Sequence, residues 1–230
     1  LSVQLDTRLK EMGVSGYSIE NVSQVQDKNG EWRPIDSDKD PTIILLHYPS
    51  ILEDTINYIP PRVKIEISCL SMDEPTELRP IRSLIGESFD GEDTDAESLV
   101  RTVVPSRTFL EKLFLLAEEF QKEKPRSVRM SRHLYDLEKL MDTEYGKEAL
   151  SNRELYDAIV EHRKTYYALK YVNYDSYTPS TINFTIPESA MEAWQDDYAD
   201  MRRFFIYGES LEFDDLMHRI EELQKRVGNI

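Results

Sequence analysis

The spacing of apolar residues changes once along this chain, near Val104, and that change constrains the fold more than any other feature. Before Val104, apolar residues alternate with polar ones or form short runs, which is typical of strands. From Pro105 onward they recur every three or four residues, which is typical of amphipathic helices. The sequence therefore predicts an α+β fold, with a strand-rich part at residues 1–104 and a helical part at residues 105–230.

Strands are expected throughout the first part. Residues 42–48 form a nearly continuous apolar run, and in the segment 63–68 Val63, Ile65 and Ile67 alternate with polar residues. The weaker expectations are strands at 16–25, 79–85 and 98–104, a short helix at 1–12, and a solvated acidic loop at 87–97.

Helices are expected throughout the second part. Thr108 and Glu111 have the spacing of a capping box, which predicts that a helix begins at Thr108. The later helices are expected from Ser131, over 152–171, and over the apolar stripes within 191–205 and 213–227.

The charge and cysteine content exclude several classes of protein. The 44 acidic and 28 basic residues among 230 give a formal net charge of −16, which disfavours non-specific binding to nucleic acid or to an anionic membrane. A nucleic-acid or triphosphate substrate would therefore need local basic residues or metal ions. Cys69 is the single cysteine, so an internal disulfide is excluded and a reducing cytoplasm is the expected location. No apolar run approaches the roughly 18 residues of a membrane span, so no membrane partner is expected.

Three residues near the start of the expected helix at Ser131 are candidates for chemistry. Arg132 and Asp136 lie on the polar side of that helix, and His133 lies at its margin. Together they could bind phosphate and ribose, or orient an attacking hydroxyl. The structural alternative is an ion pair between Arg132 and Asp136 in successive turns, which would stabilise the helix by roughly 0.2–0.5 kcal/mol.

Lys112 and Glu66 are two further candidates. Lys112 is expected in the first turn of its helix, where an ammonium opposes the helix dipole unless an anion shares the site, which favours phosphate binding. The alternative is a solvent-exposed lysine. Glu66 is on the polar side of an alternating strand, where it could hold a divalent ion or pair with a neighbouring cation.

The segments that contain Lys112 and Asp136 are similar to the signature of a known family. Thr108–Leu113 (TFLEKL) and Arg132–Leu137 (RHLYDL) resemble the signature of the AbiEii/AbiGii nucleotidyltransferase toxins. The resemblance spans almost the whole chain and is most specific over 105–137. The other segments that carry it are Asp40–Pro49, Ile65–Ile67, Arg101–Arg107, Tyr198–Gly208 and Phe213–Met217.

The resemblance implies part of the mixed sheet of a nucleotidyltransferase fold, followed by a C-terminal helical bundle that completes the nucleotide site. It also implies transfer of a nucleoside monophosphate from an NTP with the help of two Mg²⁺ ions. Some characterised relatives modify transfer RNA at its acceptor end. An RNA, such as tRNA, or a protein is therefore the implied acceptor, and a cognate antitoxin encoded nearby is an implied partner.

Residue roles follow from matching the signature. Lys112 would contact the triphosphate, and Asp136 would orient the nucleophile or the nucleotide, so these are the expected catalytic residues. Arg132 and His133 would support Lys112 in binding the nucleotide. Glu66 would stand where nucleotidyltransferases place a third metal-binding carboxylate.

The sequence departs from the family in one respect. The family begins with a Gly-Gly or Gly-Ser loop and an Asp-x-Asp pair that hold the metals, and neither dipeptide occurs here. Asp-x-Asp occurs at Asp36/Asp38, Asp38/Asp40 and Asp93/Asp95, none of them at the family's position relative to the Glu66 strand. Leu1 aligns just after the family's catalytic hairpin, so we expect this chain to lack that N-terminal segment. The alternative function is a catalytically incomplete binding or regulatory module that keeps the fold.

Overall fold

The chain forms two compact units, Leu1–Ser71 and Met72–Ile230. The structure, a computed structural model, describes residues 1–26, 31–35, 41–50, 60–67, 76–89 and 97–230. The predicted α+β class is confirmed. The described strands all pair antiparallel, in three small sheets rather than in the single mixed sheet that was expected.

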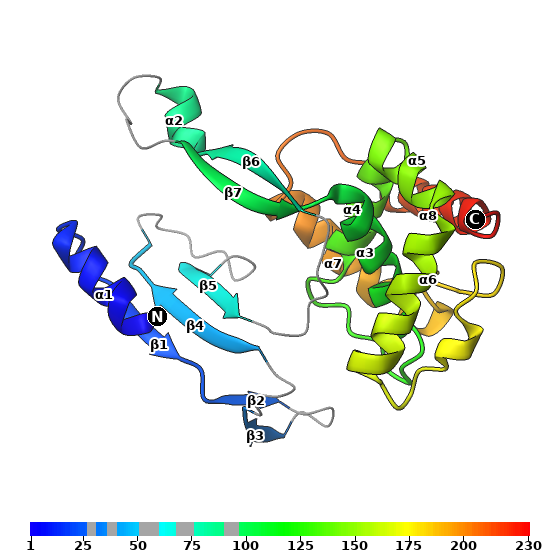
Figure 1. Cartoon of the computed structure of the whole chain (residues 1–230), viewed down its shortest axis with the longest axis horizontal. Helices are drawn as coiled ribbons and strands as arrows, with labels where there is room; N and C mark the ends of the chain where they lie inside the picture. The colour runs from blue at the N-terminus through cyan, green and yellow to red at the C-terminus, as the bar shows by residue number, and fades with distance from the viewer. Residues whose placement is uncertain (27–30, 36–40, 51–59, 68–75, 90–96) are drawn as a thin grey trace. The chain divides into compact units, whose positions relative to one another are not determined.

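The first unit is built on a three-stranded sheet of order β1-β4-β5 (Ser18–Asn21, Thr42–His47 and Arg62–Ile67). β4 is its central strand, and Ile44 and Leu45 are buried there, as the apolar run predicts. Helix α1 (Ser2–Glu11) contacts β1. The strand expected at 16–25 is two strands, because β2 (Gln24–Gln26) pairs separately with β3 (Trp32–Pro34) (Figure 1).

The second unit begins with an antiparallel hairpin of β6 (Thr76–Arg82) and β7 (Glu97–Val103). The short helix α2 (Leu84–Ser88) follows β6, at the end of the hairpin away from the helices (Figure 1). Part of the expected acidic loop is therefore helical, and its residues 90–96 lie outside the described part of the chain. Arg79 donates a 3.0 Å hydrogen bond to the hydroxyl of Tyr145, which attaches the hairpin to the helices.

The rest of the second unit is a helical bundle with a continuous apolar core. α3 packs against α4, α5 and α6, and α4 also packs against α7 and α8 (Figure 1). Its α-helices are α3 (Pro105–Glu119), α4 (Ser131–Met141), α5 (Glu144–Ser151), α6 (Arg153–His162), α7 (Met191–Phe204) and α8 (Phe213–Val227). Short turns of other helix types are η1 (Arg163–Tyr167), η2 (Tyr174–Ser176) and η3 (Glu188–Ala190). The largest side chains of the core include Phe109, Phe114, Leu134, Leu137, Tyr156, Trp194 and Tyr198.

The predicted capping box at Thr108 is wrong, because α3 begins one turn earlier. Val104 is the N-cap in extended conformation, and Pro105 occupies the first turn, where its fixed φ favours helix and its missing N–H costs nothing. Glu111 does not cap the helix, since its carboxylate pairs with Arg107 and Arg163.

The helix expected over 152–171 is shorter than predicted. α6 ends at His162 and continues as the π-helical turn η1, which stops at Ala168 in the left-handed conformation (φ +45°). α5 was not anticipated. It packs against the end of α4 so closely that a Cβ on Gly146 would lie 2.2 Å from the carbonyl oxygen of Leu140, which explains why glycine is needed there.

Candidate functional site

Lys112 of α3 and Asp136 of α4 are in direct contact. The Lys112 ammonium lies 2.7 Å from a carboxylate oxygen of Asp136. Both side chains are partly accessible, with 21% and 36% of their surface exposed. The two segments of the family-like signature therefore meet at one ion pair between helices.

The cores of both helices hold this pair in place. Leu113 and Leu137, which directly follow the two charged residues in sequence, are fully buried between the packed helices. The charged side chains are thus at the polar edge of a rigid interface rather than on a loop, which limits the rotamers that they can adopt.

Two sequence-based interpretations of these residues are wrong. Lys112 is in the third turn of α3, since the helix starts at Pro105, so an unfavourable interaction with the helix dipole does not arise. The alternative ion pair between Arg132 and Asp136 is not formed within the described structure, because Asp136 bonds to Lys112 and Arg132 is exposed.

His133 lies beside the ion pair and is buried, with 8% of its surface exposed. Its Nδ1 atom has no hydrogen-bond partner among the described residues. Burial, and then the positive charges of Lys112, Arg132 and Arg126, lower the pKa of His133 to about 4. The imidazole is therefore neutral at pH 7, with three cations acting on it, and its unpartnered Nδ1 atom is buried.

Two carboxylates that sequence reasoning missed hold the loop between α3 and α4. Glu119, buried at the end of α3, accepts from the Arg126 amide (2.8 Å) and guanidinium (2.9 Å) and pairs with Lys122 (2.7 Å). Asp197 of α7 accepts from the Ser131 amide (3.0 Å) and hydroxyl (2.5 Å) at the start of α4. The only sequence clue to Asp197 is indirect. Met130, at the N-cap of α4, has no side-chain oxygen to accept from the first amides of the helix, so a residue from elsewhere in the chain must do so.

Glu66 belongs to the first unit, so its relation to the Lys112–Asp136 pair stays a prediction. It lies on β5 with its side chain half exposed, and it pairs with Lys64 at 2.6 Å, as the structural alternative predicts. Within the described residues, no group of three or more His, Cys, Asp or Glu side chains is placed to hold a metal ion. The Asp-x-Asp pairs at 36–40 and 93–95 lie outside the described residues.

Among the described residues, no helix is both long and apolar enough to span a bilayer.

Comparison with known proteins identifies the family. A search of curated proteins finds no match to the chain. Residues 6–219 match the model of the family described as "Nucleotidyl transferase AbiEii toxin, Type IV TA system". Because the match covers nearly the whole chain, including every candidate residue above, this protein belongs to the AbiEii family of nucleotidyltransferase toxins of type IV toxin–antitoxin systems.

Proposed function

We propose that this protein transfers a nucleoside monophosphate from an NTP to an RNA acceptor, with tRNA as the first candidate, and that Lys112 and Asp136 are its catalytic residues. The observation that carries this proposal is the 2.7 Å contact between the two side chains, which joins the two halves of the family signature. Membership of the family supports an NTP substrate and an antitoxin partner.

The contact fits the chemistry of nucleotidyl transfer. A lysine ammonium has three N–H donors, so Lys112 can bond to Asp136 and still donate to phosphate oxygens. The acceptor hydroxyl oxygen forms a bond to the α-phosphorus while the bond from that phosphorus to the β-bridging oxygen breaks. Pyrophosphate leaves with the bonding electrons, and the carboxylate of Asp136 accepts the hydroxyl proton.

Arg132 and His133 provide further contacts for the nucleotide. The exposed guanidinium of Arg132 is suited to a phosphate, to which it can donate two hydrogen bonds. The neutral ring of His133 lies beside Lys112, and its Nδ1 atom, which is buried and unpartnered, would reach a polar atom of the ribose or base once the side chain rotates.

Nucleotidyltransferases generally use a divalent metal, and we propose Mg²⁺ for this protein. Bound Mg²⁺ would neutralise charge on the triphosphate. The described residues do not form a metal site on their own: Asp136 is paired with Lys112, and Glu66 is paired with Lys64. The roles proposed for Lys112, Asp136 and His133 therefore include no contact between these side chains and the metal ion.

Incorporation of nucleotide label into RNA tests the proposal. The full-length protein, Mg²⁺, total RNA and each NTP labelled at its α-phosphate should yield labelled RNA, and Lys112→Ala or Asp136→Ala should lower the rate at least about 100-fold. Lys147→Ala on α5 and Asp200→Ala on α7 remove the same charges from exposed positions and should retain the wild-type rate.

The outcomes separate the two functions. Labelling that survives both Lys112→Ala and Asp136→Ala would overturn the assignment of the site. Labelled protein in place of labelled RNA would change the acceptor class. No labelling by the full-length wild type with any NTP would favour a binding or regulatory module.

A further inference from the structure

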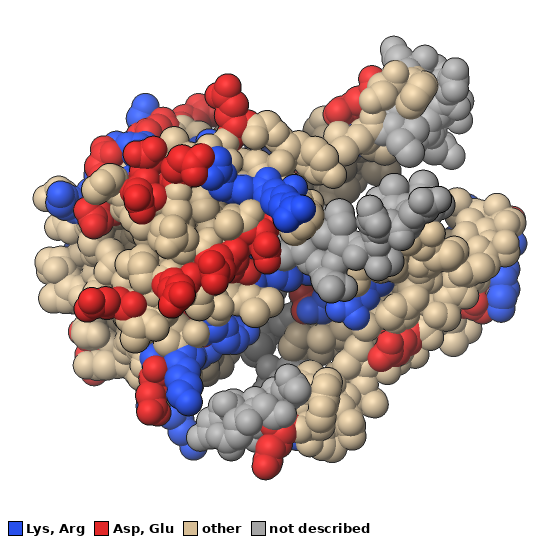
Figure 2. Space-filling view, turned by 180° about the vertical axis from the view of Figure 1, so that it is seen from behind, with Lys and Arg blue, Asp and Glu red and all other residues tan. Residues whose placement is uncertain are grey.

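The loop between α3 and α4 is strongly basic in a strongly acidic protein. Residues 119–132 contain five Lys and Arg and two Glu, a formal net charge of +3, whereas the whole chain carries −16. On the face shown in Figure 2, acidic and basic side chains occur in separate groups. Local positive charge of this kind is what a polyanion needs in order to bind to such a chain.

Buried contacts hold this loop in one conformation. Glu119 binds both Lys122 and Arg126, yet 66% of the Arg126 side chain stays exposed. Arg129 adopts a left-handed conformation (φ +58°), and its amide donates a 2.5 Å hydrogen bond to Asp197. A loop that is ordered before binding loses little entropy when a ligand arrives.

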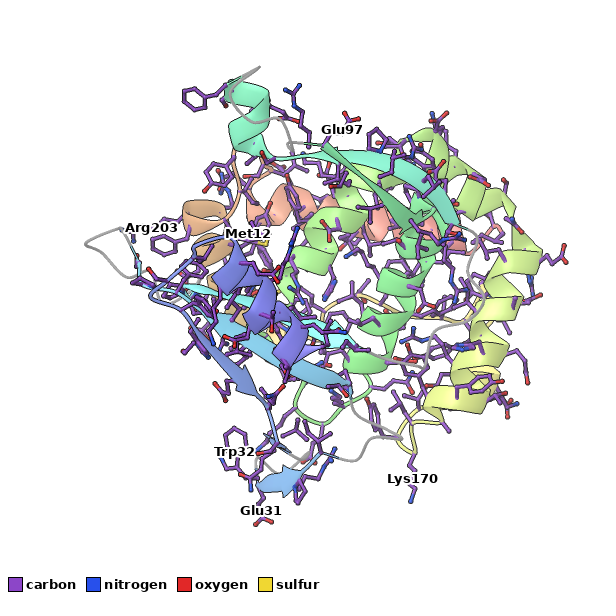
Figure 3. The ribbon with its side chains drawn as sticks, turned by 60° about the vertical axis from the view of Figure 1, so that its left-hand side comes forward. Met12, Glu31, Trp32, Glu97, Lys170 and Arg203 are labelled. Carbon is purple, nitrogen blue, oxygen red and sulfur yellow. The ribbon has the colours of Figure 1, made fainter. Side chains whose placement is uncertain are left out.

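A second segment extends the basic surface and adds an aromatic ring. The Asn173 amide donates to the side chain of Gln121 (3.3 Å), and the Lys122 ammonium lies 5.8 Å from the centre of the Tyr171 ring. Tyr171 is 45% exposed, and Lys170, in the segment between η1 and η2, points outward (Figure 3).

The surface leads to the candidate active site. The loop ends at the start of α4, where Arg132 lies one turn before Asp136, so the loop is joined directly to the helix that carries the ion pair. The basic surface, which we define as Lys122, Lys124, Arg126, Lys170 and Tyr171, therefore extends from the start of α4, next to the nucleotide contact Arg132, to the exposed tyrosine.

We propose that the basic surface binds a single-stranded part of the RNA acceptor, with phosphates on its Lys and Arg side chains and a base stacked on Tyr171. This inference rests on the proposed function and names the residues that hold the acceptor. A row of cations beside an exposed aromatic ring suits a nucleic-acid strand better than a protein. The cations pair with the phosphates, and every base has a face that can stack on the ring. An RNA strand that follows the basic surface toward the Lys112–Asp136 pair would place one of its hydroxyl groups near Asp136.

Equilibrium binding without NTP tests this inference separately from catalysis. The probe is a fluorescein-labelled 12-nucleotide single-stranded RNA, and the readout is its anisotropy on titration with the full-length protein at several salt concentrations. Lys124→Gln with Lys170→Gln should weaken binding about tenfold at low salt, and should reduce the slope of log K against log salt by about 1.4. Tyr171→Leu should weaken binding about tenfold, and Tyr171→Phe should bind within about twofold of wild type.

The matched control is Lys147→Gln with Lys225→Gln, which removes two charges from exposed positions on α5 and α8. Equal losses in the two double variants would overturn the proposal, since net charge alone would explain them. Equal binding by Tyr171→Leu and Tyr171→Phe would overturn the stacking contact. Lys112→Ala should bind the RNA within about twofold of wild type while losing transfer, so failure of the catalytic assignment and failure of the basic surface give different results. A DNA strand of the same sequence that binds as tightly would show that the surface recognises the strand but not the 2′-hydroxyl.

Discussion

At the scale of single residues, the 2.7 Å contact between Lys112 and Asp136 joins two packed helices, α3 and α4. The signature drew attention to Lys112 and Asp136, yet helical spacing could pair Asp136 only with Arg132 on its own helix. The observed partner is on another helix, and such a contact depends on how α3 and α4 pack. A partly exposed ion pair contributes only about 0–1 kcal/mol to the free energy of unfolding. Stabilisation of the fold therefore does not explain why Lys112 and Asp136 are paired.

His133 should make the folded protein less stable in mild acid. Its pKa is about 4 in the folded state and 6.5 in its ordinary state, so the unfolded chain binds the proton first as the pH falls. The stabilising effect of the neutral ring is complete above pH 6.5 and is lost progressively as the pH falls toward 4. Between pH 7 and 5 the free energy of unfolding should fall by about 2 kcal/mol more in wild type than in His133→Gln.

Urea unfolding followed by fluorescence measures this difference. A Trp32→Phe background leaves Trp194, which is buried in the same unit as His133, as the single tryptophan reporter. Parallel pH profiles of the unfolding free energy for the protein with His133 and for the His133→Gln variant would show that the histidine is not buried among cations as described.

At the scale of helices and strands, periodicity located most segments but not their ends. The 3.6-residue pattern predicted α3, α4, α7 and α8, since one apolar face of each is buried in the bundle. The predicted start of α3 is three residues too late. The sequence offers two possible starts, Pro105 and the capping box at Thr108, and the helix begins at the proline. The end of α6 was missed because η1 and the left-handed Ala168 follow it, and no glycine marks that position.

A buried ion pair attaches α3 to η1. Arg163 donates to both oxygens of Glu118, at 2.7 and 2.5 Å, and the Tyr174 hydroxyl donates to one of them at 2.9 Å. Arg163→Met should lower the free energy of unfolding by about 3–5 kcal/mol, because it leaves a buried carboxylate without its counterion. Chemical denaturation followed by circular dichroism at 222 nm measures the loss.

The double variant Glu118→Leu with Arg163→Met provides the control. It removes both charges and should recover most of the lost stability, since apolar residues can replace a buried ion pair. A double variant as unstable as Arg163→Met alone would mean that lost packing, rather than an unpaired charge, causes the effect.

At the scale of the whole chain, the change of pattern at Val104 and the division into compact units do not coincide. The pattern marks the step from β7 to α3, whereas the units divide between Ser71 and Met72. The hairpin of β6 and β7 belongs with the helices because β7 runs directly into α3 and Arg79 bonds to Tyr145. Such contacts are long-range, so residue spacing gives no information about them.

The second unit should fold by itself. Among the described residues, the first unit buries only Ile44 and Leu45 as apolar core residues, and all other buried apolar residues lie in the second. A fragment of residues 72–230 should therefore unfold cooperatively in urea, with a helical circular dichroism spectrum and dispersed amide resonances. A non-cooperative transition would show that the bundle depends on the first unit.

The transfer rates of the Lys112→Ala, Asp136→Ala and doubly substituted proteins test the central claim most directly. If the two residues act as one catalytic unit, each single substitution lowers the rate of NMP transfer to RNA at least about 100-fold, and the double variant is no more than about threefold slower than the slower single variant. A folded single variant that keeps the wild-type rate would contradict the account.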